Sequence, residues 1–118
     1  MKEKETEATA KTYAHTYDGG VTEDQINQWK RKHRKVIRIE VPDGDDLHVG
    51  YFHRPSIDTM AAVSKQTKDS EIRGAETLFK NCWLGGSEDM ATDSVLFFSA
   101  VEQLNIAFEG SKGTLKNL

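Results

Sequence analysis

The chain has 118 residues, of which 36% are hydrophobic and 30% charged, and its formal net charge is −3 at pH 7. This length fits one domain, and the charge gives no general reason to bind nucleic acid or acidic lipid. A single cysteine excludes an internal disulfide framework. No apolar run approaches the ~18 residues of a membrane span, and no signal-peptide core is present. The composition therefore predicts a cytoplasmic protein without a membrane partner.

The first twenty residues alternate Lys, Glu, Thr and Ala and contain no Val, Ile, Leu, Phe or Trp. Such a segment cannot bury enough apolar surface to offset the entropy lost when it becomes ordered. The sequence therefore predicts three parts. They are a mobile N-terminal arm over residues 1–20, a single α+β domain over 21–109 and a flexible C-terminal tail over 110–118.

A first helix is expected over roughly residues 22–34. It begins with Thr22-Glu23-Asp24-Gln25, which has the form of a capping box because the Thr22 hydroxyl and the Gln25 amide can each reach the other's backbone. Apolar and aromatic side chains then recur three and four residues apart on one face. They are Ile26, Trp29 and His33.

Five cationic residues end this helix and follow it. They are Lys30, Arg31, Lys32, Arg34 and Lys35. Cations at a helix C-terminus offset the helix dipole, so a solvated helix end is the simpler interpretation. The alternative is a phosphate-binding patch, with Tyr51 and Phe52 as stacking platforms for bases. This run therefore leaves open a second function, that of a small nucleic-acid-binding regulator.

An antiparallel hairpin is expected next. Residues 36–41 alternate β-branched and charged side chains, which is the period of a half-buried strand. Residues 42–46 have the composition of a turn. Leu47, Val49 and Tyr51 then share one face of a second strand. Because a lone hairpin is marginal in water, we expect the C-terminal half to cover its apolar face.

Two helices are expected after the hairpin, over residues 57–67 and 71–84. The inward side of the first comprises Ile57, Met60, Ala61 and Ser64. The apolar stripe of the second comprises Ile72, Ala75, Phe79, Cys82 and Trp83. We expect Gly85-Gly86 to end the second helix, because glycine readily takes the left-handed conformation past a helix C-terminus.

Thr92 or Asp93 caps a last helix that runs to about Phe108 and is apolar on most of its sides. Such a helix is either central to its domain or shared with a partner. The predicted order is helix, strand, strand and three helices. This order indicates an α+β fold, a small antiparallel β-hairpin packed on a bundle of three to four helices.

The chain carries no recognisable catalytic, cofactor or metal motif. Cys82 lies near a helix C-terminus, where the dipole disfavours a thiolate, so we interpret it as a small buried hydrophobe. The four histidines lack the spacing of a zinc site, and residues 43–46 lack the ligand pattern of a calcium loop. No nucleophile elbow or phosphate loop is present. The sequence therefore predicts a non-enzyme without cofactor or metal.

Several short motifs occur in a characteristic order. Phe52-His53-Arg54-Pro55 precedes a Met/Ala-rich helix, and Leu78-x-x-Asn81-Cys82-Trp83-Leu84-Gly85-Gly86 precedes an apolar helix that Asp93 opens. Over roughly residues 36–108 the chain resembles the small tail assembly chaperones of tailed bacteriophages and prophages. The resemblance implies a helper that acts during morphogenesis in the bacterial cytoplasm, coats the apolar, helical tape measure protein and brings tail tube subunits to it. It implies no catalytic residues, and some members also have a longer frameshifted form.

A chaperone of this kind needs an apolar surface that accepts helices. The candidate residues are Trp83, Leu84, Val95, Leu96, Phe98 and Ile106. Core packing is the alternative for each of them, because a small domain needs nearly all its apolar residues inside. Self-association through the last helix is a further expectation.

Overall fold

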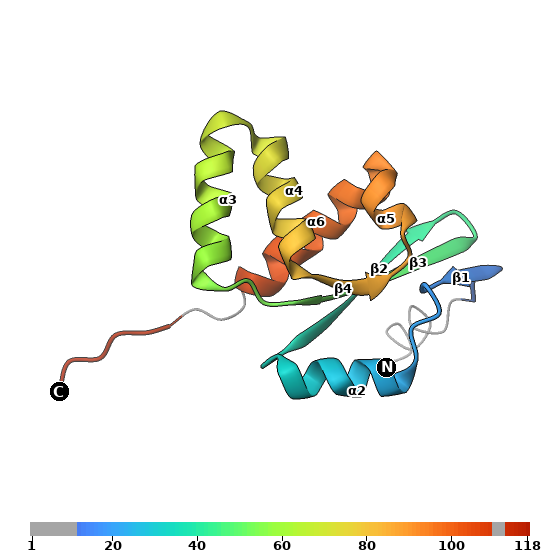
Figure 1. Cartoon of the computed structure of the whole chain (residues 1–118), viewed down its shortest axis with the longest axis horizontal. Helices are drawn as coiled ribbons and strands as arrows, with labels where there is room; N and C mark the ends of the chain where they lie inside the picture. The colour runs from blue at the N-terminus through green and yellow to red at the C-terminus, as the bar shows by residue number, and fades with distance from the viewer. Residues whose placement is uncertain (1–11, 110–112) are drawn as a thin grey trace, which may run out of the picture.

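The computed structural model describes residues 12–109 and 113–118. Their strands are β1 (His15–Tyr17), β2 (Val36–Asp43), β3 (Asp46–His53) and β4 (Trp83–Gly86). Their helices are α2 (Glu23–Lys32), α3 (Ile57–Asp69), α4 (Glu71–Cys82), α5 (Asp89–Thr92) and α6 (Ser94–Glu109) (Figure 1). Five helices and a four-stranded sheet confirm the predicted α+β class for this part of the chain. None of the helices described is long and apolar enough to cross a membrane.

The predicted hairpin is the centre of the sheet. β2 and β3 pair antiparallel over their whole length, from Val36 opposite His53 to Asp43 opposite Asp46. Gly44 occupies the turn with φ of 62°, a conformation that glycine takes without steric cost. The local turn chemistry therefore sets the register of both strands.

The other edge of β3 carries two short strands that the sequence did not predict. β1 pairs parallel with residues 46–48, and β4 pairs antiparallel with residues 50–52. The prediction of a mobile arm over residues 1–20 is therefore wrong for residues 15–17, while residues 1–11 lie outside the described part. β1 needs no buried apolar side chain of its own, because the β3 backbone supplies its partners and the Tyr17 ring stacks on His48 at 5.0 Å.

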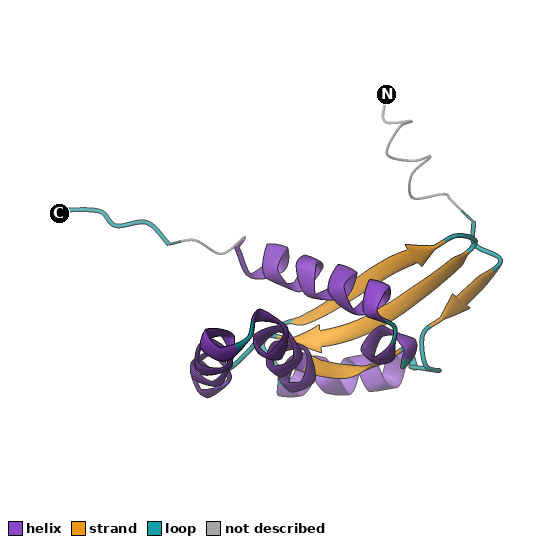
Figure 2. Ribbon diagram, turned by 90° about the horizontal axis from the view of Figure 1, so that it is seen from above, coloured by secondary structure: helices purple, strands orange, loops and turns teal. Residues whose placement is uncertain are grey.

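β3 is buried on both faces, so the hairpin has two apolar faces rather than one. One face packs Phe52 with Ile39 of β2 against α4, α5 and α6. The opposite face carries Leu47, Val49 and Tyr51. Ile26 and Trp29 of α2 cover this opposite face, and Figures 1 and 2 show α2 and α6 on opposite sides of the sheet. The C-terminal helices therefore cover one face of the sheet, and α2 covers the other, which we did not expect.

The helix starts follow the predicted capping chemistry. The Thr22 hydroxyl accepts from the Gln25 amide at 3.2 Å, and the Gln25 side chain accepts from the Thr22 amide at 2.9 Å, which confirms the capping box. The Ser56 and Ser70 hydroxyls cap α3 and α4 by accepting from the amides of Thr59 and Arg73. The Asp93 carboxylate accepts from two amides at the start of α6. These caps fix where α2, α3, α4 and α6 begin.

The predicted inward side of α3 is wrong. Ile57, Met60, Ala61 and Ser64 are all exposed, and α3 buries none of its residues fully. α3 instead packs along α4, where the Thr67 side chain lies so close to Gly74 that a β-carbon at Gly74 would collide with it. The two helices therefore form a pair in which the later residues of α4 contact the core and α3 lies on the outside (Figure 1).

α4 ends earlier and differently from the prediction. Its last residue is Cys82, and Trp83 follows in an extended conformation with φ of −66° and ψ of 132°. Gly85 and Gly86 belong to β4 rather than to a left-handed helix cap. As a strand, residues 83–86 form backbone hydrogen bonds with the free edge of β3, which they could not do as a helix cap. After α6, residues 113–118 are exposed and have no helix or strand, whereas residues 110–112 lie outside the described part.

Candidate protein-binding groove

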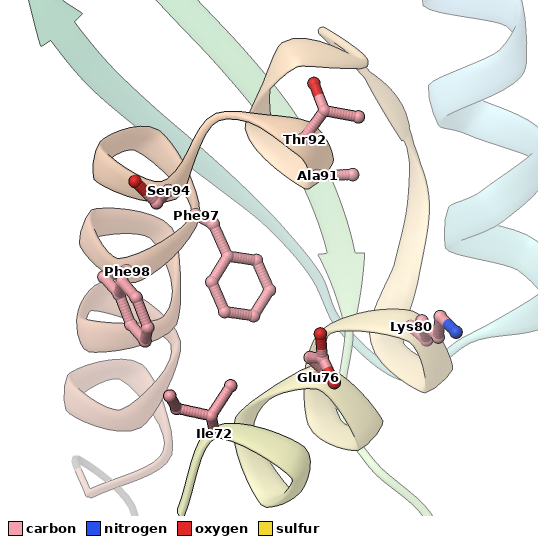
Figure 3. A pocket seen from close by; sticks show the side chains of 8 residues that line it. All are labelled: Ile72, Glu76, Lys80, Ala91, Thr92, Ser94, Phe97 and Phe98. Atoms are coloured by element: carbon pink, nitrogen blue, oxygen red, sulfur yellow. The ribbon is translucent and has the colours of Figure 1, made fainter.

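An apolar groove of about 320 Å³ lies between α4, α5 and α6. Its lining residues are Ile72, Glu76, Lys80, Ala91, Thr92, Ser94, Phe97 and Phe98. Figure 3 shows Ile72 of α4 facing the space below Phe97 and Phe98 of α6, with Ala91 and Thr92 of α5 at the other end. The groove therefore lies between α4 on one side and α5 and α6 on the other, and β4 separates these two segments in the sequence.

The surface of this groove is mostly apolar. The Phe98 side chain is 47% exposed and that of Ile72 is 55% exposed, whereas Phe97 is buried between them. Glu76 and Lys80 of α4 supply charged groups along one side. Large exposed apolar side chains that gather around a hollow mark a binding surface. The groove is thus our candidate functional site.

A second hollow of about 340 Å³ extends this groove toward the sheet. Both hollows are lined by Lys80, Ala91 and Thr92, so they form one continuous surface. The extension ends at Phe79 and Trp83, whose rings stack 5.2 Å apart. Trp83 therefore lies at the edge of the groove, and its ring is partly buried.

The six predicted protein-binding residues lie in different places. Phe98 lines the groove and Trp83 its extension. Val95 is 70% exposed one turn before Phe98 on α6. Ile106 is 53% exposed but lies beside β2, away from the groove.

The remaining two residues also lie away from this surface. Leu96 is 3% exposed in the main core, so its prediction as a surface residue is wrong. The face of α6 that carries Leu96 packs on the sheet, and a helix apolar on most sides does not reveal which side this will be. Leu84 is partly buried on the α2 side of the sheet. Sequence reasoning also missed Ile72, which it assigned to the core.

Cys82 is fully buried, as the sequence predicted for a packing residue. Burial raises the pKa of its thiol from 9.0 to about 11, which disfavours the thiolate form that nucleophilic chemistry requires. The thiol lies in the same core cluster as Phe79 and Met90. Its surroundings therefore suit packing rather than reaction.

This raised pKa predicts a loss of stability at high pH. The folded state holds the Cys82 proton up to about pH 11 and the unfolded state only to about pH 9. The stabilising contribution is therefore complete below pH 9 and disappears as the pH rises through 11. We expect the urea-derived free energy of unfolding to fall more steeply between these pH values in wild type than in Cys82→Ala. Equal slopes would contradict this account.

A buried polar pair joins β3 to the segment after β4. His48 Nδ1 and Ser87 Oγ share a hydrogen bond of 2.8 Å, and both residues are about 5% exposed or less. The pair is a serine–histidine contact that sequence spacing could not reveal, since 39 residues separate its members. Among the described residues, no carboxylate hydrogen-bonds the imidazole, as a catalytic triad would require. The contact satisfies two buried polar groups.

The predicted basic run is exposed at the end of α2. Its five cationic residues are solvent-accessible, which either interpretation of the run requires. The prediction that Tyr51 and Phe52 stack on bases is wrong, however, because these residues are 4% and 0% exposed. Neither ring can stack on a base from the core.

The ring of His33 stacks on that of His53, with centroids 4.2 Å apart. Partial burial, and then the nearby His53 and Lys32, lower the pKa of His33. His33 therefore adds little positive charge to the neighbouring basic run near neutral pH.

Within residues 12–109 and 113–118, no three His, Cys, Asp or Glu side chains gather in a way that could hold a metal ion. The apolar groove is therefore the feature of the described chain that most resembles a binding site. Comparison of the chain with protein-family models, curated proteins and solved structures gave no match.

Proposed function

We propose that this protein is a non-enzymatic tail assembly chaperone of a bacteriophage or prophage. In this role it binds an apolar helical segment of the tape measure protein in the cytoplasm of the bacterial host and aids assembly of the tail tube. The observation that supports a binding role is the exposure of Phe98 and Ile72 around the groove. The phage context rests on the resemblance carried by residues 52–55 and 78–86.

The groove has the features of a site that receives one face of a helix. Amphipathic helices bind to grooves through apolar side chains spaced three and four residues apart. The continuous surface from Ile72 to Trp83 offers apolar contact along such a row. Glu76 and Lys80 can pair with charges that flank the apolar face of the client. A client helix bound in this way would keep its apolar face out of water until it is released.

Co-expression with the tape measure protein tests the proposal. We expect wild type to increase the soluble fraction of the tape measure protein severalfold. The double variant Ile72→Gln, Phe98→Gln should abolish this gain, because it removes two exposed apolar contacts from the groove. Glutamine is a good helix former, so the variant should remain folded.

Ile57→Gln provides a matched control, because Ile57 is 87% exposed on α3 and does not line the groove. It should keep the tape measure protein soluble. Solubility that is unchanged by the presence of wild type would refute the proposed client. Solubility retained by the double variant would refute the groove as its binding site.

The alternative function is binding of nucleic acid by residues 30–35. Tyr51 and Phe52, which we expected to stack on bases, are buried in the core. The alternative still predicts a distinct result, which is salt-sensitive association with single-stranded DNA or RNA at low ionic strength. Substituting Lys30 and Arg31 by Gln would weaken such binding. We expect no such association, and a measured one would favour this alternative over the chaperone.

A further inference from the structure

β2 has one paired edge and one open edge. Its inner edge pairs with β3, and no other strand among the described residues pairs with β2. An open strand of eight residues is long enough to accept another strand. This edge lies on the side of the sheet away from β1 and β4, which both pair with β3.

The hydrogen bonds of β3 indicate which groups of β2 point outward. The Val49 carbonyl accepts from the Ser87 amide at 2.8 Å, so it points away from β2. Val49 lies opposite Glu40. Residues of an antiparallel pair alternate between exchanging backbone hydrogen bonds and pointing outward. The N–H and C=O groups of Glu40 therefore point toward the open edge. The same holds for Arg38 and Val36, which lie two and four residues before it.

We propose that this open edge pairs antiparallel with β2 of a second copy of the chain, about a two-fold axis at Ile39. In this register Arg38 lies opposite Glu40 of the second copy, and Glu40 lies opposite its Arg38. The outward backbone groups of both residues then exchange hydrogen bonds between the copies. Val36 lies opposite Pro42, which has no amide hydrogen, so the ladder ends there.

The charges on β2 favour this register over its neighbours. Arg38 and Glu40 lie on the same face, about half exposed, and form an ion pair of 2.8 Å within the chain. In the proposed pairing each of them also faces an opposite charge across the interface. A shift by two residues in either direction would place Arg38 opposite Arg38, or Glu40 opposite Glu40. Like charges directly opposite each other destabilise a sheet.

The surroundings of the edge also fit a second copy. Residues 37–40 line a hollow of about 220 Å³ together with Gln103, Ile106 and Ala107 of α6. Ile106 is 53% exposed beside the open strand, and a neighbouring copy would cover it. The alternating charges disfavour an arbitrary apolar strand, whereas they complement a second β2. This surface is separate from the groove and does not rest on the proposed function.

Sedimentation velocity over a range of concentrations tests the pairing by charge reversal. We expect wild type to dimerise, and Glu40→Arg or Arg38→Glu alone to weaken the dimer by about tenfold or more, because each places two like-charged pairs across the interface. An equimolar mixture of the two variants should form a heterodimer, because every Arg would again face a Glu. Glu88→Arg gives the same change in net charge as Glu40→Arg at a residue that follows β4, at the other edge of the sheet, and should dimerise as wild type does.

Circular dichroism establishes that each variant is folded. Arg38→Glu also removes a hydrogen bond of 2.9 Å to the Tyr51 hydroxyl. If that variant does not fold, Glu40→Arg, which keeps Arg38, decides the question alone. A wild type that remains monomeric at every concentration overturns the proposal. So does a Glu40→Arg variant that dimerises as tightly as wild type.

Discussion

Replacing Gly86 by alanine is expected to lower the free energy of unfolding by about 3 kcal/mol or more. Gly86 has φ of 139°, a conformation that residues with a β-carbon rarely adopt. A β-carbon there would also collide with the Val49 carbonyl oxygen and would lie 2.7 Å from the Gly50 α-carbon. Both atoms belong to the backbone of β3 and can move only by opening the β3–β4 pairing.

Gly20→Ala provides a comparison with a positive φ but no close contact. Gly20 also has a positive φ, 72°, but a β-carbon at this residue would have no heavy atom of another segment within 4 Å. The substitution should therefore cost only about 1 kcal/mol of backbone strain. Urea denaturation of both variants gives the comparison. If the two substitutions cost the same, the close approach of β4 to β3 is not what requires glycine at residue 86.

Replacing Phe52 by alanine is expected to cost about 3–5 kcal/mol of stability. Phe52 is fully buried, and its ring meets those of Phe79 and Trp83 edge-on at 5.2 Å and 5.3 Å. Truncation leaves a cavity at the point where β3, α4 and β4 meet. The contacts of those aromatic rings are lost together with the buried area.

Phe98→Ala is the matched comparison, because it removes the same atoms from a side chain that is 47% exposed. We expect it to cost about 1 kcal/mol or less. Thermal or urea unfolding measures both variants under the same conditions. A cost for Phe98 equal to that for Phe52 would show that Phe98 is a core residue and not available to a client.

Local chemistry made parts of this fold predictable. The capping box at Thr22 needs only residues three apart, and the hairpin needs only a turn between two alternating strands. β1 and β4 were not predictable in this way. Their main partner is the backbone of β3, which leaves no periodic pattern of side chains, and in β4 two glycines imitate the end of a helix.

The candidate site was predictable only in part, for a different reason. Sequence periodicity shows that α6 is apolar on most sides, but only the packing of α6 on the sheet decides that Leu96 is buried and Phe98 exposed. Ile72 lies in the first turn of α4, at the same helical spacing as the core residues that follow it. It precedes the buried residues of α4, which begin at Gly74, and how far along the helix the core extends is a tertiary property that no local pattern carries.

The most direct test of the central claim is the affinity of the protein for an apolar helical segment of the tape measure protein. Fluorescence anisotropy of a labelled peptide measures it without the complications of co-expression. We expect saturable binding to wild type and to Ile57→Gln, and a loss of about tenfold or more in Ile72→Gln, Phe98→Gln. Absence of binding to wild type, or equal binding to the double variant, would contradict the assignment of this groove as the client site.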